Sequence, residues 1–232
     1  LGVETTWDLN KDLQFIGMAS RVQSDLEYGY DEDWAYPSIC VGLACDGWEY
    51  NSQDNYLRDR ENSTIDFRFI SNRPALVLDL PVAWVFGFYS RQQSETLIRE
   101  YTYNSKDFSS TFDTRNSAVY GQLSLDVSSR LNLLTGIRFE NRDATYVDTD
   151  SVMHNVDEDL WGGRISLQFK MDEGRVVYGL ISRGYKAGGV NSDPDLAPED
   201  REFDTEFMWN VETGFKASWM QDKFSTQIAL FY

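Results

Sequence analysis

The chain contains no long apolar run. Its 232 residues are 41% hydrophobic, and its mean hydropathy is −0.48. A helix that spans a bilayer needs about 20 consecutive, predominantly apolar residues, so the sequence predicts no transmembrane helix. This absence does not exclude a membrane protein, because a membrane-spanning β-strand exposes only every second side chain to lipid.

Residue types used in catalysis are scarce. There is one histidine, His154, and there is no Gly-x-Ser-x-Gly motif, phosphate-cradling loop or cluster of His and Cys. We therefore expect a protein that is not an enzyme and has no cofactor. Lys and Arg number 21 against 38 Asp and Glu, for a net charge of −17. This balance argues against nucleic acid, whose phosphates need basic contacts.

Apolar and polar residues alternate through most of the chain, as in 165–171 (Ile-Ser-Leu-Gln-Phe-Lys-Met). Successive side chains of a strand point to opposite faces. Segments of about ten residues suit tilted membrane-spanning strands, which need about 9–11. Apolar residues occupy both faces of 12–24 and 175–186, so these two are ambiguous. The expected strands are 1–9, 12–24, 60–70, 77–92, 116–127, 131–145, 160–171, 175–186, 206–218 and 224–232.

The expected connections are alternately short and long. Tight polar turns are predicted at 10–12, 71–75, 128–130, 171–174 and 220–223. Long acidic loops are predicted at 25–61, 93–116, 143–159 and 186–206. An antiparallel barrel in a bacterial outer membrane has short periplasmic turns and long extracellular loops. The pattern predicts one rim with Asn10, Asn72, Ser129 and Asp172, and the other with Cys40, Asn155 and Asp195.

The two faces of the predicted wall differ in polarity. Aromatic residues make up 15% of the chain, and many lie near the expected strand ends, as in an interfacial girdle. The alternative is the general abundance of aromatic residues in β proteins. Predicted to face lipid are Ile65, Phe67, Phe69, Leu123, Leu125, Leu133, Ile137, Leu167 and Phe169. Predicted to face the lumen are Arg68, Gln122, Arg138, Gln168 and Lys170.

Aromatic residues in two of the long loops are the candidate ligand contacts. Their rings combine apolar area with polar tips, which suits a partly wet mouth. The alternative is that they pack the loops on themselves. The candidates are Trp34, Tyr36, Trp48, Tyr50, Tyr101 and Tyr103. Cys40 and Cys45 lie in the longest loop, where an oxidising environment favours a short disulfide.

Acidic residues dominate the loops and favour a neutral, cationic or metal-bearing ligand. Asp193, Asp195, Glu199 and Asp200 form a candidate Ca²⁺ cluster, because hard cations take several oxygen ligands. The spacing is not that of an EF-hand, and a solvated acidic loop is the alternative.

Two segments carry a family resemblance. Asp159-Leu-Trp-Gly-Gly-Arg-Ile-Ser-Leu-Gln-Phe-Lys170 and Gly184-Tyr-Lys-Ala-Gly-Gly-Val-Asn191 resemble the barrel of TonB-dependent outer-membrane receptors, in particular the siderophore-receptor subgroup. Weaker matches, such as Leu131-Asn-Leu-Leu-Thr-Gly-Ile-Arg-Phe-Glu140, follow in the family's order. The resemblance covers nearly the whole chain outside the long loops.

The resemblance implies a function and a set of partners. Residues 1–232 would be the central part of a single barrel domain of about 22 strands, with the plug domain and the barrel's C-terminal end absent. The receptor would lie in the outer membrane of a Gram-negative cell, in contact with lipid and lipopolysaccharide. TonB would drive import of a scarce ligand, such as a ferric siderophore or another iron complex, past the plug.

Two other interpretations of the alternation remain. One is a small autonomous outer-membrane barrel with adhesive or ligand-binding loops. The other is a secreted β-sandwich that binds carbohydrate, which would be soluble without detergent.

Overall fold

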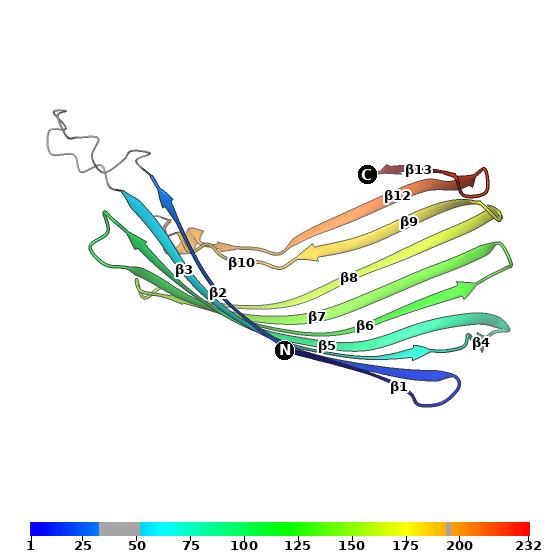
Figure 1. The fold of residues 1–232 in the computed structure, drawn as a ribbon, viewed down its shortest axis with the longest axis horizontal. Coiled ribbons are helices and arrows are strands. Elements are labelled where there is room, and N and C mark those ends of the chain that lie inside the picture. The colour runs from blue at the N-terminus through cyan, green and yellow to red at the C-terminus, as the bar shows by residue number, and fades with distance from the viewer. Residues whose placement is uncertain (33–51, 194–195) are drawn as a thin grey trace.

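A computed structural model describes residues 1–32, 52–193 and 196–232. These residues form one curved antiparallel sheet in which each long strand pairs with the next along the chain (Figure 1). In the described part of the chain, β1 and β13 are the two edges of the sheet, and the sheet is not closed. The strands in sheet order are β1 (Gly2–Asp8), β2 (Leu13–Asp31), β3 (Gln53–Ser71), β5 (Leu80–Tyr101), β6 (Phe108–Asp126), β7 (Leu131–Asp148), β8 (Met153–Asp172), β9 (Arg175–Lys186), β12 (Glu206–Trp219) and β13 (Phe224–Phe231).

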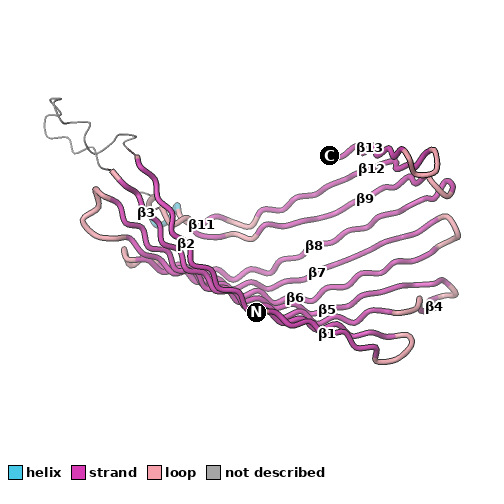
Figure 2. The backbone as a smooth tube through the Cα atoms, in the orientation of Figure 1, coloured by secondary structure: helices cyan, strands magenta, loops and turns pink. Residues whose placement is uncertain are grey.

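Short elements complete the fold. β4 (Ala75–Val77) folds back on the start of β5, and β10 (Gly189–Val190) pairs with β11 (Glu202–Phe203). A 3-10 turn, η1 (Pro198–Asp200), lies between β10 and β11 (Figure 2). Among the described residues, no helix is long and apolar enough to span a membrane.

All ten predicted strands are present, including the two ambiguous ones, which are β2 and β9. Period-two facing is also confirmed. On β8, Leu167 exposes 48% of its surface, whereas Ser166, on the opposite face, exposes 6%. Cross-strand pairing places Leu167 beside Leu133 on β7. A strand with this pattern can satisfy its backbone within the sheet while showing one apolar face.

On the apolar face, the apolar residues of most strands end at one level, on the side away from the short turns. A row of paired residues crosses five strands and is apolar throughout: Phe67, Phe88, Val119, Phe139 and Trp161. Two residues further along, away from the short turns, β3 still carries the apolar Ile65, whereas the other four strands carry the polar residues Ser90, Ser117, Asn141 and Asp159. We call the apolar side the outer face and the opposite side the inner face.

The predicted loop lengths are wrong in three places. β2, β3, β5, β6, β7 and β8 continue well beyond the apolar rows, so the connections at 102–107 and 149–152 are short. Charged residues in these extensions alternate between the faces and pair across strands, as Arg58 and Arg60 do with Glu95. The charges therefore belong to strands that project past the apolar band and do not indicate loops.

The short-turn rim is confirmed for its four predicted residues. Asn10, Asn72, Ser129 and Asp172 lie at or next to the turns β1–β2, β3–β4, β6–β7 and β8–β9, which share one end of the sheet (Figure 1). The turn expected at 71–75 is longer, because β4 and β5 form a small hairpin. Its two turn residues, Leu78 and Asp79, have φ of 51° and 64°, the left-handed values of a type I′ turn. Asn155 lies at the opposite rim, and Cys40 and Asp195 lie outside the described residues.

Candidate functional site

The inner face carries a network of hydrogen bonds among charged and phenolic side chains. The Tyr120 hydroxyl donates to Asp66 Oδ1 at 2.8 Å, and Arg68 Nη2 donates to Asp66 Oδ2 at 2.9 Å. Glu140 Oε2 on β7 accepts from Arg138 Nε of the same strand and from the Tyr185 hydroxyl of β9, at 2.8 Å each. The ion pairs therefore form between residues two apart on one strand, and the tyrosines connect the strands.

Two glycines make room for these tyrosines. A Cβ at Gly87 would overlap the Tyr120 ring, and a Cβ at Gly162 would lie 3.2 Å from a carbon of the Tyr185 ring. The rings thus lie flat on the wall above glycine backbone. Together with Arg138 they border a shallow inner-face cavity of about 590 Å³. The inner face at this level presents fixed donors and acceptors to whatever fills the lumen.

Further along the inner face, towards the long-loop end, lies a cluster of tyrosines around one arginine. Arg99 Nε and Nη2 donate to the two oxygens of Asp54, at 2.8 Å each. The Arg99 guanidinium also lies 5.1 Å from the Tyr101 ring centroid and 5.6 Å from that of Tyr56. A bidentate pair and two rings hold this guanidinium in one orientation.

The remaining rings extend this cluster across three strands. Tyr28 stacks on Tyr56 with centroids 5.1 Å apart and planes 4° apart. Tyr103 contacts Tyr101 edge to face at 5.6 Å and is 62% exposed. We call Tyr28, Tyr30, Tyr56, Arg99, Tyr101 and Tyr103 the mouth cluster. Sequence reasoning found Tyr101 and Tyr103 and missed the other four, because the contacts of those four depend on the pairing of β2 with β3 and of β3 with β5.

Hydrogen bonding sets the charge state at the base of the mouth cluster. Burial opposes ionisation of Asp54, but hydrogen bonds from Arg99 and Tyr56 outweigh it, and the pKa of Asp54 falls below its usual 3.8. Burial and the hydrogen bond to Asp54 raise the pKa of Tyr56 to about 12. At neutral pH the Asp54 carboxylate is therefore ionised and paired with the Arg99 guanidinium, and the Tyr56 phenol is neutral.

The β9–β12 connection is clamped onto the β7–β8 hairpin by two arginines. Arg142 Nη1 donates to Glu158 Oε2 at 2.8 Å and to the Gly188 carbonyl at 3.0 Å. Arg201 Nη1 donates to Asp148 Oδ2 at 2.8 Å, and the side chains of this pair are 3% and 0% exposed. Described residues of the connection are thus fixed at the long-loop rim.

We expect acid to loosen this clamp. Burial opposes ionisation of Glu158, but hydrogen bonds from Thr205, the Gly188 amide and Arg142 lower its pKa below 4.5. Its contribution to stability is therefore complete above pH 4.5 and is lost as the pH falls through the folded-state pKa. A spin label at Ala197 should gain mobility in that acidic range.

The matched control for this experiment is Glu158→Gln. This variant should show the higher label mobility already at neutral pH, with a smaller further change on acidification. The assignment of Glu158 as a pH-sensitive contact would be contradicted if the label at Ala197 were equally mobile above and below the acidic range and equally mobile in the Glu158→Gln variant.

Several predicted site residues lie outside the described part of the chain. These are Trp34, Tyr36, Cys40, Cys45, Trp48, Tyr50 and Asp195. The disulfide and the aromatic loop therefore stay predictions, and so does the Ca²⁺ cluster with Asp193, Glu199 and Asp200. Within residues 1–32, 52–193 and 196–232, no group of three or more His, Cys, Asp and Glu side chains is arranged to hold a metal ion.

Comparison with known proteins places this wall in a family context. The family model "TonB dependent receptor-like, beta-barrel" matches residues 1–232. Among solved structures, the ferric yersiniabactin uptake receptor FyuA from Yersinia pestis is similar, with a TM-score of 0.75 and 18% identity over 99% of this chain and 34% of its own. The siderophore receptor PiuA from Acinetobacter baumannii has a TM-score of 0.71 and 13% identity over 99% and 39% of the two chains.

A third similar structure is the unliganded ferric citrate transporter FecA, with a TM-score of 0.71 and 12% identity over 99% of this chain and 33% of its own. The chain thus spans only 33% to 39% of the length of these three proteins. At these identities, the likeness establishes the fold alone.

Proposed function

The chain belongs to the TonB-dependent receptor β-barrel family, and we propose that it forms the central wall of a barrel that imports a ferric siderophore or a similar iron complex. The family consists of outer-membrane receptors and transporters rather than enzymes. Its barrels expose an apolar band to lipid and enclose a polar interior. The outer face of this sheet carries such an apolar band, and the inner-face network provides a polar surface of the kind that lines such an interior.

The observation that carries the proposal is the mouth cluster. Five tyrosines and Arg99 meet on the inner face at the end where the long connections lie. Flat rings and phenolic hydroxyls suit a partly wet site that receives a planar ligand. We propose that Trp34, Tyr36, Trp48 and Tyr50 extend this surface from the long β2–β3 connection.

The rest of the transport machinery is inferred from the family. We propose that this wall is part of a longer receptor, which we call the full-length parent, and that a plug domain of this parent contacts the inner-face network around Asp66, Arg138 and Glu140. TonB would act on that plug to release the ligand into the lumen. The net charge of −17 favours a neutral, cationic or metal-bearing ligand over a strongly anionic one.

We expect the double variant Tyr101→Ala and Tyr103→Ala to weaken ligand binding by about tenfold or more. The substitutions remove the apolar area of both rings and the contact of Tyr101 with Arg99. The measurement uses cells that express the full-length parent and a panel of radiolabelled ferric catecholate, hydroxamate and carboxylate complexes. Binding of the preferred complex is compared between parent and variant at equal receptor levels.

Tyr178→Ala is the control, because Tyr178 lies on the inner face near the short-turn rim, hydrogen-bonded to Glu212. It should bind the complex as the parent does. Unchanged binding by the double variant would show that the site is elsewhere, and uptake that persists without TonB would contradict the proposed transport function.

A further inference from the structure

Arg183 places a cation on the outer face, at the end of the apolar band that lies away from the short turns. The outward residues of β9 are Val177, Gly179, Ile181 and Arg183, each paired with an outward residue of β8. Arg183 pairs with Gly163 on one side and with Trp209 of β12 on the other. It therefore lies next to Trp161, which ends the apolar band on β8.

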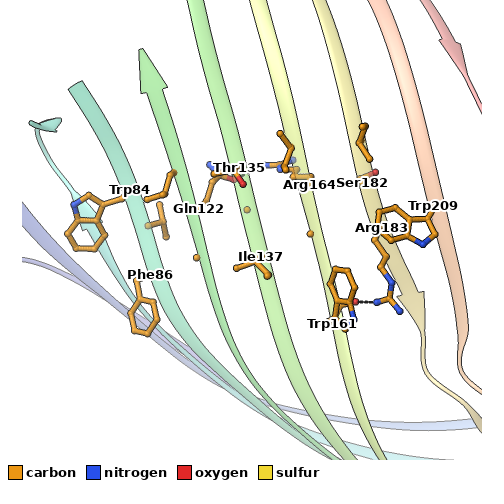
Figure 3. Close-up of a pocket in the computed structure, with 17 residues that line it drawn as sticks. Trp84, Phe86, Gln122, Thr135, Ile137, Trp161, Arg164, Ser182, Arg183 and Trp209 are labelled. Atoms are coloured by element: carbon orange, nitrogen blue, oxygen red, sulfur yellow. Dashed lines mark hydrogen bonds between the residues drawn. The ribbon is translucent and has the colours of Figure 1, made fainter. Parts of the chain in front are cut away.

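The guanidinium of Arg183 is held by aromatic rings. Its carbon lies 4.0 Å from the ring centroids of both Trp161 and Phe207. One N–H is donated to the Trp161 carbonyl oxygen, as the dashed line in Figure 3 marks. Trp209 meets Trp161 edge to face at 6.1 Å. The rings fix the cation in place without neutralising it.

No carboxylate in the described parts of the chain forms an ion pair with Arg183; the other arginines that lie against rings, Arg99, Arg138, Arg142 and Arg175, each have one. A guanidinium carries five N–H donors. Arginine on the lipid face costs about 2–4 kcal/mol at the midplane and about 0–1 near the interface. An anionic partner from the membrane side would complete its coordination.

Beside Arg183 the outer face is hollowed. The hollow has a volume of about 710 Å³ and is lined by Trp84, Phe86, Leu123, Ile137, Ile165 and Trp209, with Arg183 among its lining residues (Figure 3). It exists because Gly121 and Gly163 occupy outward positions and add no side chain to the wall. The site thus combines an apolar trough with one held cation.

We propose that this site binds a phosphate-bearing, acylated sugar of the outer leaflet, which is the chemistry of lipopolysaccharide. A phosphate accepts from the remaining N–H groups of Arg183, for which guanidinium geometry is well matched. The indole rings of Trp161 and Trp209 offer flat faces to a sugar, and an acyl chain lies in the trough. The proposal rests on the outer-membrane location of the wall and is independent of which iron complex the receptor takes.

Two variants test separately the contributions of the Arg183 charge and of the apolar trough to lipid binding. Arg183→Gln removes the cation. Gly121→Leu fills the trough, and its Cβ is tolerated because the nearest atom, the Val85 carbonyl oxygen, lies 3.5 Å away. The control is Arg175→Gln, which removes a cation on the same strand that also lies against a ring, 5.8 Å from that of Trp219, but at the short-turn rim.

The full-length parent and each variant are placed in nanodiscs of phosphatidylcholine containing a small fraction of diphosphorylated hexa-acyl lipid A. Native mass spectrometry then counts the lipid A retained per receptor. We expect Arg183→Gln and Gly121→Leu to lower retention about tenfold and Arg175→Gln to leave it unchanged. The parent should retain dephosphorylated lipid A only as weakly as Arg183→Gln retains the phosphorylated form.

Circular dichroism and radiolabelled iron uptake show whether each variant is folded and active. Equal retention by Arg183→Gln and the parent, or equal retention of phosphorylated and dephosphorylated lipid A by the parent, would overturn the proposal. If Gly121→Leu does not assemble, Ile181→Phe narrows the same trough and takes its place. If the unsubstituted parent takes up no iron complex, the result counts against the proposed function and not against this site.

Discussion

We expect Leu167→Arg to lower the free energy of unfolding of the full-length parent in a bilayer by about 2–4 kcal/mol. Leu167 lies on the outer face, between the apolar partners Leu133 and Gly179, well inside the apolar band. At this depth the guanidinium would be surrounded by hydrocarbon without a partner. Denaturant unfolding of the parent and variant in the same lipid measures the difference.

The matched control is one residue away. Gln168 faces the inner side of the same strand, so Gln168→Arg should change the unfolding free energy by less than about 1 kcal/mol. Equal costs for the two substitutions would show that the faces are not distinguished by lipid, and a larger cost at 168 would mean that the assignment of the faces is reversed.

The second large effect concerns the rim. Arg201→Met should lower the free energy of opening of the β9–β12 connection by about 3–5 kcal/mol, because it leaves the fully buried Asp148 carboxylate without its cation. Amide exchange of Asn191 and Asp200, which donate to the carbonyls of Arg201 and Ala197, measures this opening. The global unfolding of the barrel should change much less.

Lys186→Met provides the contrast. Lys186 and Glu206 are 3.8 Å apart, with side chains 71% and 72% exposed, so removing this pair should cost less than about 1 kcal/mol. If Arg201→Met leaves the exchange of both amides unchanged, then the buried pair does not hold the connection in place.

Period-two alternation predicted the strands and their faces because a strand has only two sides. The alternation around Leu167 and Phe169 was therefore sufficient to assign these side chains to the outer face. The same rule failed where both faces are polar: around Arg58, Arg60 and Glu95 the charges predicted a loop, although they pair across β3 and β5. Composition alone cannot distinguish a solvated loop from a strand that extends beyond the membrane.

The residues of the candidate sites were likewise predicted only in part from the sequence. Tyr101 and Tyr103 stood out as aromatic residues in an expected loop. Tyr28 and Tyr56 did not, because their stacking depends on the pairing of β2 with β3. Arg183 gave no signal, since its partners Trp161 and Phe207 come from two other strands and become its neighbours only through sheet order. Contacts between strands require the register, and the sequence pattern does not specify it.

The most direct test of a membrane-embedded wall is the accessibility of spin labels placed one at a time at residues 161–170 of β8 in the full-length parent in lipid. Outward labels at 161, 163, 165, 167 and 169 should be accessible to oxygen, which concentrates in hydrocarbon, and the even positions should not. A period of two residues with maxima at the odd positions is the predicted result. No periodicity, or maxima at the even positions, would contradict the assignment of the outer face to lipid and the receptor function that depends on it.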